Sequence, residues 1–370
     1  QSLGPLSIQI HTDLKEVRPR FSRGSRFIRT GDISPSGARA VFGFRGDIIT
    51  VPAEKGDPRN ITHSAATHDQ FPKWSPDGKK IAFFSDSSGE YQMVIVSNSV
   101  KLERKTFKLN GAGFYTSISW SPDSQKICFT DNARNIFWIS LDTGKITKIN
   151  SEPHYVPGAF GSMFGNWSPD SNWITYHLNN TADMSQVYIY SIKNGKSHLL
   201  SDGLSDISEP VFDPSGKYLY FLVSTDAGPI KHWFDMSNSD RRFSNTIYFV
   251  SLQKETISPL AKENDEEKIS KSKPKVKPKS KGEKKPKEIR IDFNNIEKRI
   301  LALPIGMGAY ANLQIGKTGE IFYLEFKPGT RGGILHQFNL KRRKDKVLGK
   351  GIFDYRISAN HKKMLVRYRR

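Results

Sequence analysis

One five-residue pattern recurs along most of the chain and limits its fold more than any other feature. In its fullest form the pattern reads Trp-Ser-Pro-Asp followed by Gly or Ser. Its copies begin, in chain order, at Ile33, Trp74, Trp120, Trp167, Phe212, Ile315 and Ile357. The prolines of the first five copies stand 41 to 47 residues apart, and the last two copies keep the apolar residue and the turn chemistry without the proline. Self-similarity at such a period is typical of repeat architectures, so we count seven structural units.

Each repeat has the same internal order of turns and apolar runs. The apolar residue precedes a Pro-Asp-Gly turn, in which Pro fixes φ and Gly accepts a positive φ. An alternating strand follows, as at residues 80–84, then a second apolar run, as at residues 92–96, and then a tight turn with an edge strand, as at residues 142–149. Four strands in a unit of about 45 residues predict an all-β fold, a seven-bladed β-propeller of four-stranded antiparallel blades with WD40-like or TolB-like repeats.

The seventh repeat is short. We expect a first strand near residues 353–357 and a second near residues 363–368, after which the chain stops. The N-terminal stretch at residues 6–10 can supply one outer strand that closes the ring, which leaves the last blade incomplete or completed in part by the N-terminus. We therefore expect this chain to be a segment of a longer polypeptide.

Large side chains at the repeated position indicate a structural role. Trp74, Trp120, Trp167 and Phe212 occupy one place in successive blades, where a large side chain fills the wedge between neighbouring sheets. The single cysteine, Cys128, lies in an alternating strand and is expected to be a buried small hydrophobe rather than a nucleophile.

Composition divides the chain into four parts. Residues 1–28 form an N-terminal segment with the candidate closing strand, residues 29–261 form blades 1 to 5, and residues 289–370 form the end of blade 5, blade 6 and a partial blade 7. Between them, residues 262–288 are rich in Lys, Pro, Ser and Glu with few apolar side chains. Such a composition predicts a disordered insertion, because it cannot offset its conformational entropy.

The charge of the chain is concentrated in two places. The formal net charge is +20, of which residues 268–287 carry +9 and residues 341–370 carry +10. The rest is electrically balanced, and no stacking aromatic side chains are interleaved with the lysines, so we expect no nucleic-acid partner. No run approaches the roughly 18 apolar residues of a membrane-spanning helix, so we expect no membrane partner. The compartment is left open.

Several stretches besides the repeats resemble a known family. They are residues 33–39, 51–56, 59–62, 74–79, 84–91, 205–210, 218–222, 224–229, 291–293 and 299–304. Together they resemble the second propeller of tricorn proteases and their bacterial tricorn-like relatives, over nearly the whole chain. The Trp-Ser-Pro-Asp-Gly element alone is shared with TolB and the prolyl-oligopeptidase group, so the matches outside the repeats favour tricorn.

The resemblance implies a function in proteolysis. In that family a seven-bladed propeller precedes a PDZ domain and a serine peptidase core, and its axial channel admits and filters unfolded peptides. It implies peptide or unfolded polypeptide as substrate, the adjacent PDZ and peptidase domains as partners, homo-oligomers, and a cytoplasmic or exported location. The family's catalytic residues lie in the core beyond Arg370, so none is carried over. The alternative is a stand-alone, TolB-like propeller that acts as a protein interaction scaffold.

The residues themselves offer no catalytic group. The chain lacks a Gly-x-Ser-x-Gly elbow, a His-Glu-x-x-His helix and a Walker glycine loop, and its nine histidines have no metal-ligand spacing. The neighbours His68 and Asp69 lack a nearby nucleophile and are not expected to act as a catalytic pair. We therefore predict no catalytic residue, no metal and no cofactor in this segment.

The loops on one face of the ring carry the candidate binding residues. Aromatic and polar side chains mixed in this way suit sequence-tolerant contact with an extended peptide. The substrate-channel candidates are Arg45, His68, Tyr115, Tyr155, Phe164, Asp206 and Tyr310. The structural alternative for the aromatic members is that they only pack the rim.

Overall fold

The structure, a computed structural model, describes residues 24–99, 102–109, 113–153, 163–182, 184–226, 244–262 and 288–368. The candidate closing strand at residues 6–10 and nearly all of the lysine-rich segment lie outside these ranges. Within these ranges there are two short 3₁₀ helices, η2 (Ser25–Phe27) and η3 (Ile296–Arg299), and every other element is a strand. The all-β prediction is therefore confirmed for the described residues.

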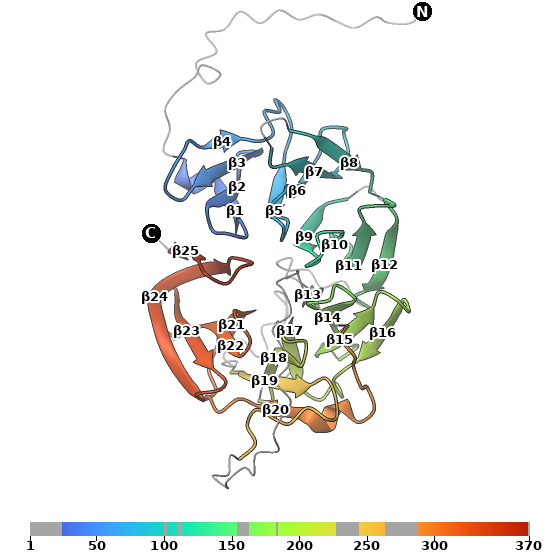
Figure 1. The fold of residues 1–370 in the computed structure, drawn as a ribbon, viewed down its shortest axis with the longest axis vertical. Coiled ribbons are helices and arrows are strands. Elements are labelled where there is room, and N and C mark those ends of the chain that lie inside the picture. Colours follow the sequence, from blue (N-terminus) through green and yellow to red (C-terminus); the bar gives the residue numbers. More distant parts are fainter. Residues whose placement is uncertain are drawn as a thin grey trace, which may run out of the picture.

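Six antiparallel sheets are arranged around a common axis (Figure 1). In five of them four strands follow one another in sequence order, from the axis outward. The first three sheets contain β1 (Ile28–Ile33), β2 (Arg39–Phe44), β3 (Asp47–Pro52) and β4 (Arg59–Asn60); β5 (Gln70–Trp74), β6 (Lys80–Ser85), β7 (Gln92–Ser97) and β8 (Arg104–Phe107); and β9 (Tyr115–Trp120), β10 (Lys126–Asp131), β11 (Asn135–Ser140) and β12 (Ile146–Ser151). The prediction of four-stranded antiparallel blades is confirmed.

The remaining sheets continue the ring. They contain β13 (Phe164–Trp167), β14 (Trp173–Asn179), β15 (Ser185–Ser191) and β16 (Lys196–Leu199); β17 (Asp206–Phe212), β18 (Tyr218–Ser224), β19 (Thr246–Ser251) and β20 (Ile300–Ala302); and β21 (Tyr310–Ile315), β22 (Glu320–Glu325), β23 (Gly333–Asn339), β24 (Lys344–Ile357) and β25 (Met364–Tyr368). The fifth sheet thus takes its fourth strand, β20, from beyond the lysine-rich segment.

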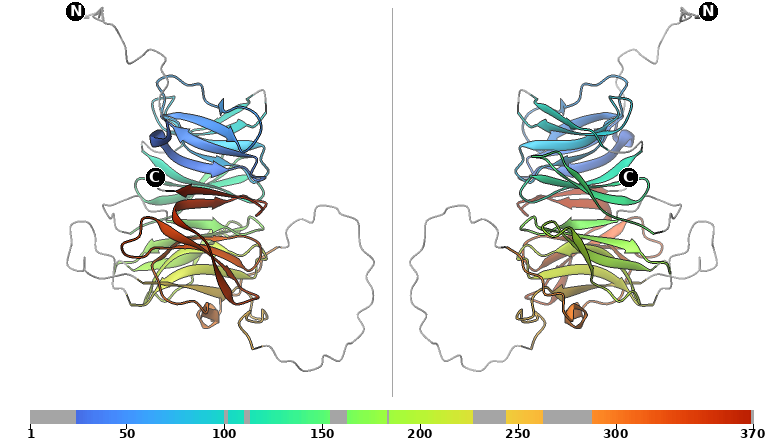
Figure 2. Two further views of the ribbon diagram at one scale, coloured as in Figure 1. Left: turned by 90° about the vertical axis from the view of Figure 1, so that its left-hand side faces the viewer. Right: turned by 90° about the vertical axis from the view of Figure 1, so that its right-hand side faces the viewer.

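The prediction of seven blades is wrong for the described residues, which form six. The seventh repeat does form a hairpin near the expected residues, but β24 runs unbroken for 14 residues through the expected blade boundary. Its first half pairs with β23 from Lys344 onward, and its second half pairs with β25 up to Ile357. The register of β24 shifts near Gly349, but pairing continues on both sides of the shift, so the two strands of the seventh repeat extend the sixth sheet to five strands (Figures 1 and 2).

The repeated turn is built by its own side chains. In the second sheet the Ser75 hydroxyl donates to Asp77 at 2.6 Å, and the amide N–H of Gly78 donates to the Ser75 carbonyl at 2.9 Å. Gly78 has φ of 72°, a value that glycine adopts without the steric cost of a side chain. The same serine-to-aspartate bond recurs at Ser121 and at Ser168, so each copy fixes the hairpin between the first two strands of its blade.

The repeated aromatic residues fill the space between blades, as predicted. Trp74, Trp120, Trp167 and Phe212 are all at least 93% buried, and each packs in a cluster with side chains of the preceding sheet. Two of the indoles also bond across the interface. Trp120 Nε1 donates to the Lys73 carbonyl, and Trp167 Nε1 donates to the Ser119 carbonyl, each at 3.1 Å. The wedge is therefore held by packing and by hydrogen bonds.

The ring meets itself where β25 faces the first sheet. The amide N–H of Asn360, in the turn before β25, donates to the Pro35 carbonyl at 3.1 Å. The side chain of Lys363 packs over Gly37. Within the described ranges β25 pairs only with β24, so this junction is made by packing and one turn-to-turn hydrogen bond rather than by a shared sheet.

Candidate functional site

A large cavity lies on the axis of the ring, where the innermost strands converge. Its volume is about 1510 Å³, and its lining residues come from the first strand of every sheet and from β24 and β25. This exceeds the roughly 300–1,000 Å³ of ordinary small-molecule pockets. The cavity is therefore the main concave site of the described structure.

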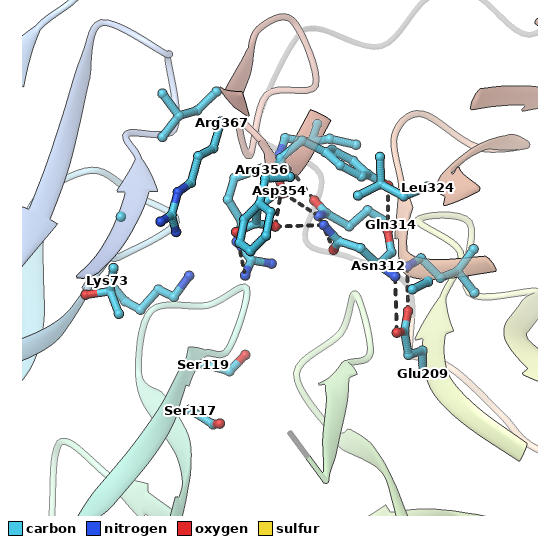
Figure 3. A pocket seen from close by; sticks show the side chains of 18 of the residues that line it. Lys73, Ser117, Ser119, Glu209, Asn312, Gln314, Leu324, Asp354, Arg356 and Arg367 are labelled. Carbon is cyan, nitrogen blue, oxygen red and sulfur yellow. Dashed lines mark hydrogen bonds and ion pairs between the residues drawn. The ribbon is translucent and has the colours of Figure 1, made fainter. Parts of the chain in front are cut away.

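Its walls come from equivalent positions of the repeat. Residues one to three places before the repeated apolar residue line the cavity, such as Lys73 before Trp74 and Ser117 to Ser119 before Trp120. In Figure 3 Lys73, Ser117 and Ser119 project into the open space from neighbouring strands. The same repeat thus places a large apolar residue in the wedge and polar residues on the axis.

The innermost strands carry β-bulges at these positions. The pairing register shifts between the first and second strands in every sheet, and again between the two halves of the β24–β25 hairpin. Four residues there have φ between 52° and 59° although none is glycine: Phe71, Ser117, Glu209 and Asn312. A bulge interrupts the ladder and re-aims nearby groups, and left-handed non-glycine residues of this kind concentrate at functional sites.

A second set of polar side chains joins neighbouring blades around the axis. The residue before the repeated apolar position accepts a hydrogen bond from the amide N–H of the equivalent apolar residue in the next repeat. The three bonds are Trp74 N–H to Asp32 at 2.9 Å, Phe212 N–H to Asn166 at 2.9 Å, and Ile357 N–H to Gln314 at 3.3 Å. These side chains hold the wall together, so their polar atoms are already engaged.

Glu209 performs a similar function for the sixth sheet. Its carboxylate accepts the amide N–H groups of Asn312 at 3.1 Å and Leu313 at 2.6 Å, which satisfies the bulge of β21 (Figure 3). Burial raises the pKa of Glu209, and the two amide hydrogen bonds oppose that rise. Asn312 in turn donates to Asp354 at 2.8 Å. A network of polar groups therefore continues from β17 through β21 to β24.

Cationic side chains gather next to this network. Lys73 pairs with Asp32 at 3.3 Å, and the guanidinium of Arg356 lies 3.7 Å from Asp354. Arg367 on β25 lies over the Phe353 ring, with Cζ 5.0 Å from the ring centre. In Figure 3 Lys73, Arg356 and Arg367 point into the same part of the cavity from three strands.

Two histidines, His177 and His361, also line the cavity. His177 on β14 is half-buried, and desolvation together with the positive charge of Arg134 lowers its pKa to about 4. It is therefore neutral at physiological pH. No motif or spacing distinguishes His177 from the other eight histidines in the sequence.

Three of the predicted channel residues lie on the rim or in the core. Arg45 is exposed at the turn between β2 and β3, with Cζ 5.0 Å from the Phe27 ring centre. His68 is exposed, and its Nδ1 lies 2.8 Å from the Tyr91 hydroxyl. Tyr115 is buried and stacks on Phe84 with ring centres 5.5 Å apart, which is the packing alternative.

The other candidates have structural contacts or lie outside the described atoms. Asp206 accepts the amide N–H of Ser185 at 2.9 Å and so joins the fourth and fifth sheets. The Tyr310 hydroxyl donates to the Gly306 carbonyl at 2.9 Å. Tyr155 lies outside the described residues, and Phe164 begins β13 with its side chain undescribed. None of the five candidates with described side chains lines the axial cavity, and their role in substrate contact stays a prediction.

The described residues offer little for catalysis. His68 and Asp69 do not bond to each other in this part of the chain: Asp69 accepts from the Ser64 hydroxyl at 2.6 Å, while His68 faces Tyr91. Cys128 is buried, and burial raises its pKa well above the usual range. Within the same ranges no cluster of three or more His, Cys, Asp or Glu side chains could hold a metal, and no helix is long and apolar enough to cross a membrane.

The ring of antiparallel sheets around a polar axial cavity defines a β-propeller domain. The tricorn protease second beta propeller domain matches residues 28–370, which is most of the chain. The chain therefore belongs to this family, and the resemblance seen in the sequence is confirmed.

Relatives and solved structures agree with this assignment. A Tricorn-like protease C-terminal subunit of Sulfurisphaera tokodaii is 23% identical over 273 residues, covering 71% of this chain and 28% of the relative. A tricorn protease homolog of Saccharolobus solfataricus is 20% identical, covering 99% of this chain and 32% of the relative. The crystal structure of the tricorn protease superposes with a TM-score of 0.72 at 17% identity, covering 93% of this chain and 32% of that one. This chain thus spans about a third or less of the length of these proteins.

Proposed function

We propose that this chain is a non-catalytic propeller domain that binds extended peptides in its axial cavity and guides them toward a serine peptidase core of a longer protein. The cavity carries this proposal, since it lies on the ring axis and is larger than an ordinary small-molecule site. Membership of the tricorn propeller family supports the link to proteolysis.

The wall of the cavity suits an unfolded chain better than a folded partner. The bulges in the innermost strands interrupt the ladders beside the cavity. In the described ranges the innermost strand of each sheet also pairs on one side only, and the unpaired edge of a strand offers main-chain groups to an extended peptide, whose own amides and carbonyls need partners. Recognition through main-chain groups tolerates many sequences, as a domain that admits unfolded polypeptides requires.

Site-specific photocrosslinking tests the location of binding. A benzophenone amino acid is placed at position 119 in the cavity wall or, as the matched control, at position 199 on the outer strand β16, where Leu199 is 46% exposed. An unstructured peptide of about a dozen residues should label the chain from position 119 and not from position 199. Equal labelling at both positions, or labelling at position 199 alone, contradicts the proposal.

The guiding step is tested in the longer protein. Ser119→Trp narrows the cavity and should slow cleavage of an unfolded polypeptide more than cleavage of a dipeptide-sized substrate. Equal effects on both substrates would exclude passage through this cavity. The alternative, a TolB-like scaffold that docks folded proteins on its outer surface, predicts no effect of Ser119→Trp on partner binding.

A further inference from the structure

We propose that the wall formed by Lys73, Arg356 and Arg367 is a carboxylate-binding subsite of the axial cavity. This inference rests on the proposed function, because it names the chemical group of the peptides that the cavity selects. The ligand group is a carboxylate, either the C-terminus of a peptide or an Asp or Glu side chain.

The three side chains come from strands that the fold brings together where the ring meets itself. Lys73 projects from β5, Arg356 from β24 and Arg367 from β25, and all three line the cavity (Figure 3). Positions 73 and 356 are equivalent in the repeat, each one residue before the repeated apolar position. Two cations are therefore placed by the repeat, and the third is added by the short last hairpin.

Within the described residues, the nearby carboxylates engage Lys73 but leave most donors of the two arginines free. Asp32 accepts from Lys73 through Oδ1 and from the amide N–H of Trp74 through Oδ2. Asp354 accepts two hydrogen bonds on Oδ1, from Asn312 at 2.8 Å and from its neighbour's amide N–H at 2.9 Å. Both acids are thus engaged mainly by other groups of the wall.

The guanidinium groups keep a surplus of N–H donors. An arginine side chain has five donors, yet the described residues give Arg356 only a 3.7 Å ion pair with Asp354, and its Nε is buried there without a hydrogen-bond partner. The described residues provide Arg367 with the face of Phe353 and no ion pair. Planar guanidinium groups with free donors match the geometry of a carboxylate.

The electrostatics of the cavity point the same way. Five Lys or Arg side chains line the cavity: Arg26, Arg29 and the three cations of the subsite. Only two carboxylates, Glu209 and Asp354, are among its described lining residues, so positive charge predominates. Burial lowers the pKa of Lys73; the charge of Asp32 opposes this shift and that of Arg356 adds to it. A cavity lined by one sign of charge concentrates ligands of the opposite sign.

Matched peptides test the subsite on the 370-residue chain. Four decapeptides carry a neutral dye and are built on one polar, uncharged sequence. The first pair differs only at the C-terminus, which is amidated in one peptide and free in the other. The second pair is amidated and contains two glutamates in one peptide and two glutamines at the same positions in the other. Fluorescence anisotropy should show tighter binding, by about five- to tenfold at low salt, for at least one carboxylate peptide over its uncharged match. The free C-terminus and the glutamate peptide separate the two sources of the carboxylate.

Charge-matched variants test the location. Arg367→Gln and Arg356→Gln should each reduce the carboxylate preference to about twofold or less while leaving the neutral peptide unchanged. Arg29→Gln elsewhere in the cavity and Arg342→Gln on the outer surface remove the same charge and should keep most of the preference, and circular dichroism checks the fold of each variant.

Three results overturn the inference. Equal binding of glutamate and glutamine peptides, together with equal binding of the free and amidated C-termini, excludes a carboxylate subsite and leaves peptide binding intact. If Arg342→Gln and Arg367→Gln reduce the preference for carboxylate peptides equally, the preference comes from the net charge of the chain rather than from this wall. Failure of every peptide to bind the cavity refutes the proposed function and the subsite together.

Discussion

The indole hydrogen bonds between blades make a quantitative prediction. Trp167 and Trp74 occupy the same position in the repeat and are 4% and 5% exposed. Trp167 Nε1 donates to the Ser119 carbonyl of the preceding sheet at 3.1 Å, whereas Trp74 Nε1 is buried without a partner among the described residues. Replacing either by Phe removes a similar ring volume, but only Trp167→Phe breaks a hydrogen bond.

We expect Trp167→Phe to cost about 1–2 kcal/mol more than Trp74→Phe in the free energy of unfolding. Loss of a neutral hydrogen bond that leaves its acceptor beside a cavity falls in this range, whereas Trp74→Phe removes a buried donor that was already unsatisfied. Trp120→Phe, whose indole donates to the Lys73 carbonyl, should behave like Trp167→Phe.

Urea unfolding followed by far-ultraviolet circular dichroism measures the difference, because tryptophan fluorescence itself changes in these variants. The slope of the unfolding free energy with urea should stay the same, which shows that the variants differ in stability alone. Equal costs for all three variants would refute the reasoning, since packing would then explain the whole effect.

Three further predictions concern the cavity wall. In Gly165→Ala the new Cβ would lie 2.3 Å from the Pro210 carbonyl of the next blade, so urea unfolding should show a loss of about 1–3 kcal/mol, whereas Gly306→Ala, with open space around it, should be neutral. The folded pKa of His177 is about 4, below its ordinary 6.5, so between these values only the unfolded chain binds the proton. The contribution of neutral His177 to the free energy of unfolding is therefore present above pH 6.5 and is lost as the pH falls to 4. In unfolding measured across this range, His177→Gln should recover about 3 kcal/mol of that loss. Burial raises the folded pKa of Glu209, so its contribution to the free energy of unfolding is present below about pH 4.5 and decreases as the pH rises through the folded value. Unfolding curves should show that Glu209→Gln becomes more stable relative to the parent chain as the pH rises. A difference in stability that does not change with pH would contradict this.

The sequence predicts the blades well because their main determinants are local. Each copy of the repeat contains its own turn. In the second sheet Ser75 bonds to Asp77 and Gly78 has a positive φ, so these residues specify a hairpin without distant contacts. The burial of Trp74 and Trp120 follows from periodicity in the same way. The number of blades depends on whether β24 breaks. Gly349 and Gly351 permit either a bulge within one strand or a break between two strands, so the sequence near residue 350 does not decide the number.

The residues of the cavity wall were harder to predict because a bulge depends on backbone geometry. Left-handed φ is common for Gly and Asn, yet the four bulge residues are Phe71, Ser117, Glu209 and Asn312, which share no side-chain property. Contacts between blades impose this conformation, so the local sequence does not predict it. The usable signal is the offset from the repeated apolar residue, which places Lys73, Glu209 and Asn312 on the axis once a propeller is assumed.

The position of this strain bears on how the cavity works. Left-handed φ at a non-glycine residue costs roughly 1–3 kcal/mol and persists only where surrounding contacts hold it. Here Glu209 satisfies the amides of the neighbouring bulge, and Asp32, Asn166 and Gln314 bond each wall strand to the next blade. A wall held in this way is formed before any ligand arrives, which lowers the ordering cost of binding. In the proposed peptide site, selection would depend on the groups that these bonds leave free, among them the guanidinium groups of Arg356 and Arg367.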